Sequence, residues 1–247
     1  MRRKSLIRNR YGQYLHAYGW GNPCEDRRKA EVHQTEAEHH PAKPVGSYKL
    51  VKACGIDMTE CSLIEENGRA HFLTKRFDRK DGKKVHMQTL CGMAHYDYRL
   101  HRAYSYEQAF NVMRDLRLPY SEAKEMFRRM VFNVVVRNQD DHTKNISFLM
   151  EGDGKWHLSP AYDMGYAYNP NGGWSATHQM SINGKFDDIT RQDLLAFAQQ
   201  NNIKDASLII DEICEAASHW PQIARECNVP AAMIKAIEPF RHYRLFP

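Results

Sequence analysis

A strongly apolar helical stretch that runs into a dense polar segment constrains this chain more than any other feature. From Met126 onward, apolar residues fall at i, i+1, i+4, i+5, i+8 and i+9, and this spacing is typical of one wide face of an α-helix. Ser121, followed by two glutamates within its first turn, is a suitable helix start. The sequence therefore predicts a buried helix over 121–136, with the polar segment 137–145 directly after it.

The polar segment leads into a predicted β-hairpin. The apolar run 146–150 and the shorter run 155–158 flank a Gly-bearing loop of about four residues, a length that is common in hairpins. We expect Phe148 and Trp156 to face the core from the inner side of this hairpin. Residues 161–165 follow as a loop.

Helix starts can be recognised in the C-terminal third. Thr190 followed by Asp193 fits a capping box, in which the two residues satisfy each other's backbone amides. Asp205 is a suitable cap for a second helix, and Pro230 suits the first position of a third. This part of the chain is therefore predicted to be helical.

The N-terminal side gives weaker signals. Residues 1–46 show no sustained period and hold several glycines and prolines, so no stable structure is predicted for them. After the end of a helix at 47–53, the runs 62–65 and 70–75 flank an Asn-Gly pair, which is a strong hairpin signal. The charged stretch 79–84 then marks a boundary between a small strand-bearing lobe and a helical one.

Composition excludes several classes of protein. No apolar run approaches the ~18 residues that a membrane span needs, and the six cysteines form no C-x-x-C pair, which favours reduced thiols in a cytoplasmic protein. The net charge is +5, but residues 1–29 hold eight basic and two acidic residues, so the remaining chain is close to neutral. We expect this basic terminus to be solvated and expect no direct binding of nucleic acid.

Two carboxylates and an amide are placed to meet at one end of the hairpin. Asp140 and Asn145 precede the hairpin, and Asp163 follows it, 23 positions after Asp140. Because a hairpin returns the chain to the end where it began, these oxygen-bearing side chains converge without a long-range coincidence. Phosphoryl transfer uses such a set, with one carboxylate for the proton of the attacking hydroxyl and two oxygen ligands for Mg²⁺. On composition alone, an ordinary polar turn remains the alternative.

Several segments carry a resemblance to a known family. They are Arg76–Arg79, His86–Leu90, Ala103–Glu107, Asp140–Asn145 and Pro160–Met164. In this order and spacing they resemble the HipA-like serine/threonine kinases, the toxins of bacterial toxin-antitoxin systems. The resemblance covers roughly residues 50–245. It implies an α+β, protein-kinase-like fold with a mainly helical C-lobe that contains the catalytic-loop hairpin.

The resemblance implies a role for each polar residue of the catalytic loop. Asp140 would be the catalytic base, and Lys144 would neutralise the charge that develops on the phosphate. Asn145 and Asp163 would bind Mg²⁺. The implied cofactors are therefore ATP and Mg²⁺.

Three further residues are assigned to the nucleotide site by the same resemblance. The Phe77 segment would contact the adenine through its backbone, with Asp78 nearby. His142 would bridge the catalytic loop to the lobe beneath it. A histidine beside carboxylates could instead be a metal ligand or a base.

The resemblance also divides the chain into parts. Residues 1–46 would be a divergent or poorly ordered N-terminal segment, 47–78 a remnant of the N-lobe with the hinge, and 79–247 the C-terminal kinase lobe. A phosphate-binding loop and the strand lysine of the N-lobe are not recognisable, because the Gly-x-Gly at 19–21 lacks flanking strand periodicity. The chain would be a truncated or rearranged member of the family, or a partner chain would complete its lobe.

The implied partners are a protein substrate, which is an aminoacyl-tRNA synthetase in known cases, and a HipB-like helix-turn-helix antitoxin. Three other hypotheses stay open. The chain could be a non-catalytic kinase lobe that binds an antitoxin or another chain. It could be a metal-dependent hydrolase that uses Asp140, Asp141, His142 and Asp163. The third and weakest is DNA binding through the first 29 residues.

Overall fold

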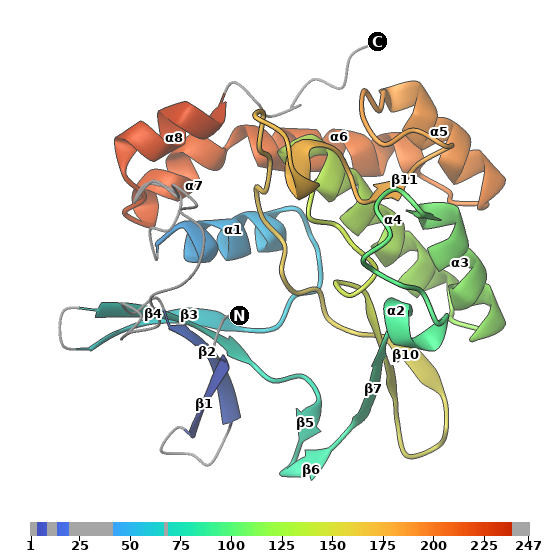
Figure 1. Ribbon diagram of the computed structural model, residues 1–247, viewed down its shortest axis with the longest axis horizontal. Coiled ribbons are helices and arrows are strands. Elements are labelled where there is room, and N and C mark those ends of the chain that lie inside the picture. The colour runs from blue at the N-terminus through green and yellow to red at the C-terminus, as the bar shows by residue number, and fades with distance from the viewer. Residues whose placement is uncertain (1–3, 9–13, 20–41, 67–68, 239–247) are drawn as a thin grey trace.

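The computed structural model describes residues 4–8, 14–19, 42–66 and 69–238 (Figure 1). Within them the fold is α+β, with most helices gathered on one side, the antiparallel sheets on the other, and the short parallel pair β8-β11 among the helices. The helices are α1 (Ala42–Ala53), α2 (Leu90–Met93), α3 (Tyr106–Asp115), α4 (Tyr120–Val136), α5 (Arg191–Gln200), α6 (Ala206–Ser218), α7 (Trp220–Glu226), α8 (Ala231–Ile237) and the 3₁₀ helix η2 (Trp174–Ala176). No helix in these ranges is long and apolar enough to cross a membrane.

The strands are short and belong to several small sheets. They are β1 (Lys4–Arg8), β2 (Tyr14–Gly19), β3 (Cys61–Glu66), β4 (Arg69–Lys75), β5 (Arg79–Lys80), β6 (Lys83–Lys84), β7 (His86–Thr89), β8 (Tyr104–Ser105), β9 (Ser147–Met150), β10 (Trp156–Leu158) and β11 (Met180–Ser181). The largest sheet has the order β1-β2-β4-β3, and a second has the order β10-β9-β7. The shorter strands pair as β11-β8 and β5-β6.

The largest sheet includes strands that the sequence does not predict. The hairpin expected at 62–75 is present as β3 and β4, and its Asn-Gly turn lies outside the described residues. In the segment 1–46, however, β1 and β2 are regular strands, and the first residues of α1 are helical. Strand β2 pairs with β4, where Leu15 faces Lys75. One of its two partner strands is thus far along the chain, and local periodicity carries no signal for that pairing.

Helix α4 is the centre of the core, as the apolar face predicted (Figure 1). Its start differs from the expectation, because the helix begins at Tyr120 after Pro119, and Ser121 lies inside it. Glu122 accepts hydrogen bonds from the backbone N–H of Leu158 and from His157. The acidic first turn therefore fastens α4 to strand β10.

The second hairpin forms as predicted, with Trp156 opposite Met150 and Leu158 opposite Phe148. Phe148 is fully buried, and Trp156 packs against the core while half-buried. Strand β7 adds to the other side of β9. The sheet thereby fixes the end of the catalytic-loop segment against the rest of the helical part.

The C-terminal helix starts agree only in part with the sequence. The capping box is present, since the Thr190 hydroxyl accepts from the backbone N–H of Asp193, and the Asp193 carboxylate accepts from that of Thr190. Asp205 stands before α6, but its side chain makes no capping bond and lies 3.4 Å from the ammonium of Lys124. Its φ of 58° is in the left-handed region, whereas an N-cap residue usually has an extended backbone. Pro230 precedes α8 by one residue rather than opening it.

Candidate active site

The polar segment after α4 is fastened to the helix before it reaches the hairpin. Arg137 ends α4 in the left-handed conformation, with φ of 54°. Asn138 then donates twice to Asn133, from its backbone N–H to the carbonyl and from its amide to the side-chain oxygen, both at 2.9 Å. The start of the loop is therefore fixed to the last turns of a buried helix.

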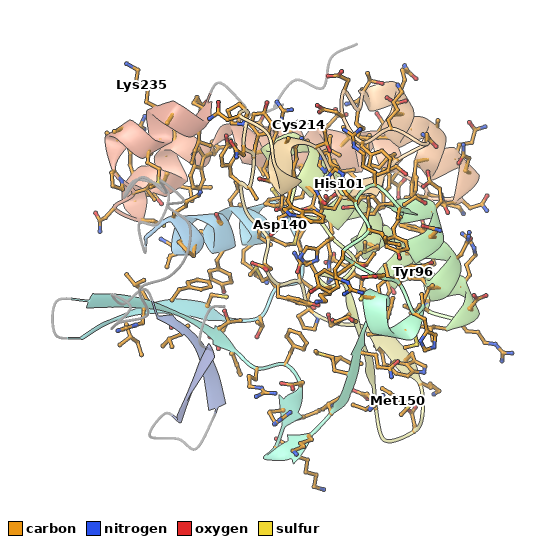
Figure 2. The ribbon with its side chains drawn as sticks, in the orientation of Figure 1. Tyr96, His101, Asp140, Met150, Cys214 and Lys235 are labelled. Atoms are coloured by element: carbon orange, nitrogen blue, oxygen red, sulfur yellow. The ribbon has the colours of Figure 1, made fainter. Side chains whose placement is uncertain are left out.

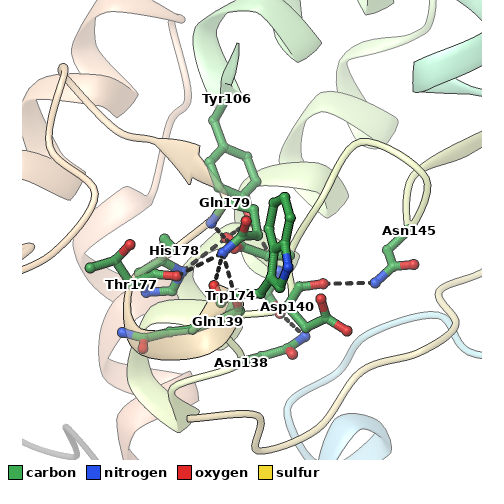
Figure 3. A network of polar contacts seen from close by, with 11 residues as sticks. Tyr106, Asn138, Gln139, Asp140, Asn145, Trp174, Thr177, His178 and Gln179 are labelled. Atoms are coloured by element: carbon green, nitrogen blue, oxygen red, sulfur yellow. Dashed lines mark hydrogen bonds and ion pairs between the residues drawn. The ribbon is translucent and has the colours of Figure 1, made fainter. Parts of the chain in front are cut away.

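A pocket opens beside this loop and brings several predicted site residues together. Asn145, His142 and Asp163 all line it. Asp140 is exposed beside the pocket, where its backbone carbonyl accepts from the Asn145 amide at 2.8 Å (Figure 3). In the whole molecule, Asp140 lies where the helices and the sheets meet (Figure 2). The other lining residues are Tyr106, Met126, Arg129, Asn133, Asn138, Asp141, Ile146, Ala161, Tyr162 and Met164.

The Asp163 loop is held on both sides. Before it, the backbone N–H of Ala161 donates to Asp57 at 2.7 Å. After it, Ala167 exchanges backbone hydrogen bonds with Arg137 and Gln139 at the start of the catalytic loop. Asp163 itself has φ of 56°, a left-handed conformation that is uncommon for residues other than glycine. The surrounding bonds therefore impose a costly conformation on the residue expected to bind the metal.

His142 and Asp140 face each other, with His142 Nε2 3.8 Å from Asp140 Oδ1. The other ring nitrogen of His142, Nδ1, accepts a hydrogen bond from the backbone N–H of Lys144 at 3.3 Å. Because an accepting nitrogen carries no proton, this contact places the ring hydrogen on Nε2. The ring therefore presents an N–H to the Asp140 carboxylate.

Lys144 is fixed at its backbone, and its ammonium lies on an aromatic ring. The carbonyl of Lys144 accepts from the hydroxyl of Tyr162 at 2.7 Å. Its Nζ lies 3.0 Å from the centre of the Tyr98 ring, a cation–π contact. Lys144 is not among the residues that line the pocket with Asn145 and Asp163.

The expected hinge segment, Phe77 and Asp78, lies beside the loop that holds Asp163. Phe77 packs on Tyr162, the residue before Asp163, with ring centroids 5.6 Å apart. The Asp78 carboxylate is bound by Arg76 and by Arg79. Partial burial raises the pKa of Asp78, but these two guanidinium groups outweigh burial and hold that pKa below its usual value. Asp78 therefore organises the hinge through its arginines.

Asp141 has a structural position that sequence reasoning underestimates. This buried carboxylate accepts from the Tyr106 hydroxyl at 2.8 Å, from the backbone N–H of Gln179 at 2.8 Å, and contacts His178 Nδ1 at 2.9 Å. Burial and then the charge of Asp141 raise the pKa of Tyr106 well above its usual value. The sequence interprets Asp141 only as a loop-shaping residue, because its partners lie 35 or more positions away.

The donor set favours a hard cation over a transition metal. Across the part of the chain that the structure describes, no group of three or more His, Cys, Asp or Glu side chains could hold a metal ion. Asp141, which the hydrolase hypothesis requires, is committed to Tyr106, His178 and Gln179. Asn145 and Asp163 supply oxygen donors in one pocket, and oxygen donors are what Mg²⁺ prefers.

Comparison with solved structures defines the class of fold as kinase-like. HipA of Shewanella oneidensis, solved with HipB and its operator DNA, matches 94% of this chain and 57% of its own, with a TM-score of 0.65 and 18% identity. The proinflammatory kinase CtkA of Helicobacter pylori matches 96% of this chain and 95% of its own, with a TM-score of 0.55 and 13% identity.

The family follows from the sequence. The model of the HipA-like C-terminal domain matches residues 27–220, so this chain belongs to that family. The “Putative kinase Y4mE” of Sinorhizobium fredii is 26% identical over an alignment of 126 positions, and the match covers 47% of this chain and 30% of that protein. A protein of Haemophilus influenzae named “Putative kinase” is 27% identical over an alignment of 129 positions. The match covers 47% of this chain and 38% of that protein. The matched regions thus span about a third of these relatives.

Proposed function

We propose that this chain is a HipA-like protein serine/threonine kinase that transfers the γ-phosphate of ATP to a protein hydroxyl in the cytoplasm. One observation supports this most directly: Asn145 and Asp163 line one pocket, and the Asn145 amide donates to the backbone carbonyl of Asp140 beside it. This arrangement fits the oxygen-bearing set that phosphoryl transfer requires. Family membership and the kinase-like fold agree with it.

Each carboxylate has its own role in this proposal. Asp140 is exposed, so a substrate hydroxyl can reach it and give up its proton during attack. The amide nitrogen of Asn145 is bound to the Asp140 carbonyl, which leaves its oxygen to bind a cation with Asp163. When bound there, Mg²⁺ supplies positive charge against the phosphates.

His142 and Lys144 assist this set. His142 Nε2 lies 3.8 Å from Asp140 Oδ1, so the imidazole orients the carboxylate. Lys144 neutralises phosphate charge, for which its ammonium has to leave the face of the Tyr98 ring. Catalysis therefore includes a movement of the Lys144 side chain.

The nucleotide lies against the hinge in this proposal. The Phe77 segment contacts the adenine through its backbone, and Phe77 is already packed on Tyr162 beside the metal loop. Asp78 keeps the hinge in shape through Arg76 and Arg79. This arrangement would set the position of the adenine relative to the site of the phosphates.

The partners are proposed by likeness. HipA of Shewanella oneidensis is solved with HipB and operator DNA, so we propose a HipB-like helix-turn-helix antitoxin as a partner of this chain. The substrate is a protein, and an aminoacyl-tRNA synthetase is the first to examine. Residues 47–78 are proposed as the remnant of the N-lobe with the hinge, and 79–247 as the C-lobe.

One observation favours the alternative, a non-catalytic lobe that binds an antitoxin or partner chain. Helix α1 lies beside the largest sheet (Figure 1) and contains no acidic residue. Protein kinases use a glutamate on such a helix to hold the lysine that pairs with the phosphates. A chain without that ion pair positions ATP less firmly, and positioning contributes much of this catalysis.

A Mg²⁺-dependent ATP-binding titration separates the two functions. The full chain should bind ATP more tightly with Mg²⁺, and Asp163→Asn should remove that gain because one oxygen ligand loses its charge. Asp153→Asn is the matched control, since Asp153 is an exposed carboxylate in the hairpin loop paired with Lys155. Transfer of label from γ-labelled ATP to lysate proteins should follow binding. ATP binding that ignores both Mg²⁺ and Asp163 would leave the non-catalytic lobe as the better account.

A further inference from the structure

An exposed aromatic surface lies beside the catalytic loop. We call it the aromatic ledge, and it consists of Tyr98, Leu100, His101, Arg102 and Trp174. Its two halves are in contact, because the rings of His101 and Trp174 meet edge to face with centroids 5.3 Å apart. Arg102 also reaches the hydroxyl of Thr177, at 3.4 Å. A loop near residue 100 and helix η2 therefore form one continuous surface.

Exposed apolar side chains are concentrated on this ledge. Tyr98, Leu100 and Trp174 are 42%, 56% and 57% exposed. The other large exposed apolar residues within the described ranges are scattered over separate elements: Ile64, Met87, Tyr120 and Leu208. Single exposed apolar residues are ordinary, whereas a contiguous group marks an interaction site.

Trp174 is exposed although its backbone is fixed. Gln179 is buried, and its side-chain amide donates to the carbonyls of Trp174 and Thr177. The backbone of Gln179 is bound in turn to Asp141, so the network that anchors the catalytic loop also carries the indole (Figure 3). A large aromatic side chain on a rigid turn loses little entropy on binding, which is the usual property of an interface anchor.

A chain of contacts connects the ledge to the proposed catalytic base. The Tyr98 ring lies 6.4 Å from the His142 ring, and His142 Nε2 is 3.8 Å from Asp140 Oδ1. Lys144 rests on the same tyrosine. A molecule that lies on the ledge is therefore within reach of Asp140.

The charge of this region favours an acidic occupant. Arg99 and Asp97 neutralise each other in an ion pair of 2.8 Å, and the Arg99 hydrogen bonds lower the pKa of Asp97 to about 2. Arg102 contacts the hydroxyl of Thr177 and the ring of Phe186, and Lys144 lies on the Tyr98 ring and is also attracted by the Asp97 carboxylate. A carboxylate of a partner would therefore meet the Arg102 guanidinium on the ledge, with the Lys144 ammonium beside it.

The rings favour a polypeptide over single-stranded RNA. Proteins that bind bases by stacking offer open aromatic faces. Here Tyr96 is stacked on Tyr104, one face of Tyr98 carries Lys144, and His101 and Trp174 pack edge to face. Aliphatic and aromatic side chains of a peptide can fill the space between such rings, as in protein interfaces.

We propose that the aromatic ledge binds the polypeptide substrate, and that it selects acidic side chains close to the hydroxyl that is phosphorylated. The identity of the occupant as a substrate rests on the proposed kinase function. Binding itself does not, because no residue of the ledge is among those proposed to bind ATP or Mg²⁺. The two ideas can therefore fail separately.

Peptide binding without ATP tests the proposal. Two fluorescein-labelled serine peptides of equal length, one with Glu and Leu around the serine and one with Lys replacing Glu, are titrated with the full chain by fluorescence anisotropy. The acidic peptide should bind at least about tenfold more tightly than the Lys peptide, and Leu100→Ala or Trp174→Ala should weaken it about tenfold. Arg102→Glu should narrow or reverse the preference. Leu208→Ala on α6, at 58% exposure, is the matched control and should change nothing.

Three results would contradict the proposal that the aromatic ledge binds an acidic peptide. They are equal binding of the two peptides, no binding of the acidic peptide, or tight binding that survives both Leu100→Ala and Trp174→Ala in variants with unchanged melting temperature. If an oligouridine displaces the peptide without being in excess over it, the surface binds RNA rather than a peptide. In Asp140→Asn, peptide binding should persist while transfer is lost. If the wild-type chain binds the acidic peptide but transfers no phosphate, the proposed kinase activity is wrong and the proposed peptide site stands.

Discussion

The two sides of the catalytic loop differ more than their sequence suggests. Asp140 and Asp141 are neighbours, yet Asp140 is exposed beside the pocket, and Asp141 is 3% exposed among Tyr106, His178 and Gln179. One carboxylate can meet a substrate, and the other cannot. An adjacent pair of identical residues thus divides into an exposed carboxylate, which we propose as the reactive group, and a buried anchor, because the chain turns between open and buried surroundings.

The anchor side makes the reactive side rigid. Asn133 donates to the Tyr106 hydroxyl at 3.0 Å, and that hydroxyl donates to Asp141. Helices α3 and α4 and the segment before β11 are thereby connected through one buried carboxylate. Reactive groups need such support from locked neighbours to keep their geometry.

The largest effect is expected on the reactive side. Asp140→Asn should lower the rate of phosphoryl transfer by about 10²–10⁴-fold, because the amide cannot accept the proton of the hydroxyl. The melting temperature should stay within about 2 °C of the wild type, since Asp140 is exposed. Labelled ATP and thermal unfolding measure the two quantities. A large fall in stability with unchanged transfer would reverse the roles given to the two sides.

The anchor side should respond in the opposite way. Asp141→Ala should lower the free energy of unfolding by about 3–5 kcal/mol, because the buried partners His178 and Tyr106 lose their acceptor. Urea unfolding followed by circular dichroism provides the measurement. Asp153→Ala, at an exposed carboxylate, should change it by less than about 0.5 kcal/mol. If the two variants were equally stable, Asp141 would not be an anchor.

The sequence predicts the local parts of this site well. Helix α4 follows from its apolar face, the β9–β10 hairpin from two short runs around glycines, and the start of α5 from a capping box. Asn145 and Asp163 reach one pocket because the hairpin returns the chain to its start. These features depend on residues that are close along the chain.

The parts that the sequence does not reveal depend on distant partners. Strand β2 is stabilised by pairing with β4, and β7 by pairing with β9. Asp141 acquires its role from residues 35 to 38 positions away. Asp140 and Asp141 have the same side chain, so no local pattern distinguishes which of them turns inward. Only the packed fold separates them.

Tyr106, which donates a hydrogen bond to Asp141, should affect stability less than Asp141 itself. Tyr106→Phe removes the hydroxyl that binds both Asp141 and Asn133. The free energy of unfolding should fall by about 1–3 kcal/mol because two buried polar groups lose a partner. Tyr120→Phe is the control, since that hydroxyl binds the Lys204 amide at the surface. Equal results for the two variants in urea unfolding would contradict the buried network.

A third carboxylate, intermediate in burial, gives the smallest effect and one that depends on pH. Arg76 and Arg79 hold the pKa of Asp78 below its usual value against the opposing effect of partial burial. A carboxylate with a lowered pKa adds stability above its unfolded pKa, near 4, and loses that contribution as the pH falls through the folded value. At pH 7, Asp78→Asn should therefore cost about 1 kcal/mol of unfolding free energy. The gap between wild type and variant in urea unfolding should close below about pH 4. A gap of constant size from pH 7 to pH 3 would show that the ion pairs of the hinge contribute nothing, and that Asp78 resembles Asp140 more than Asp141.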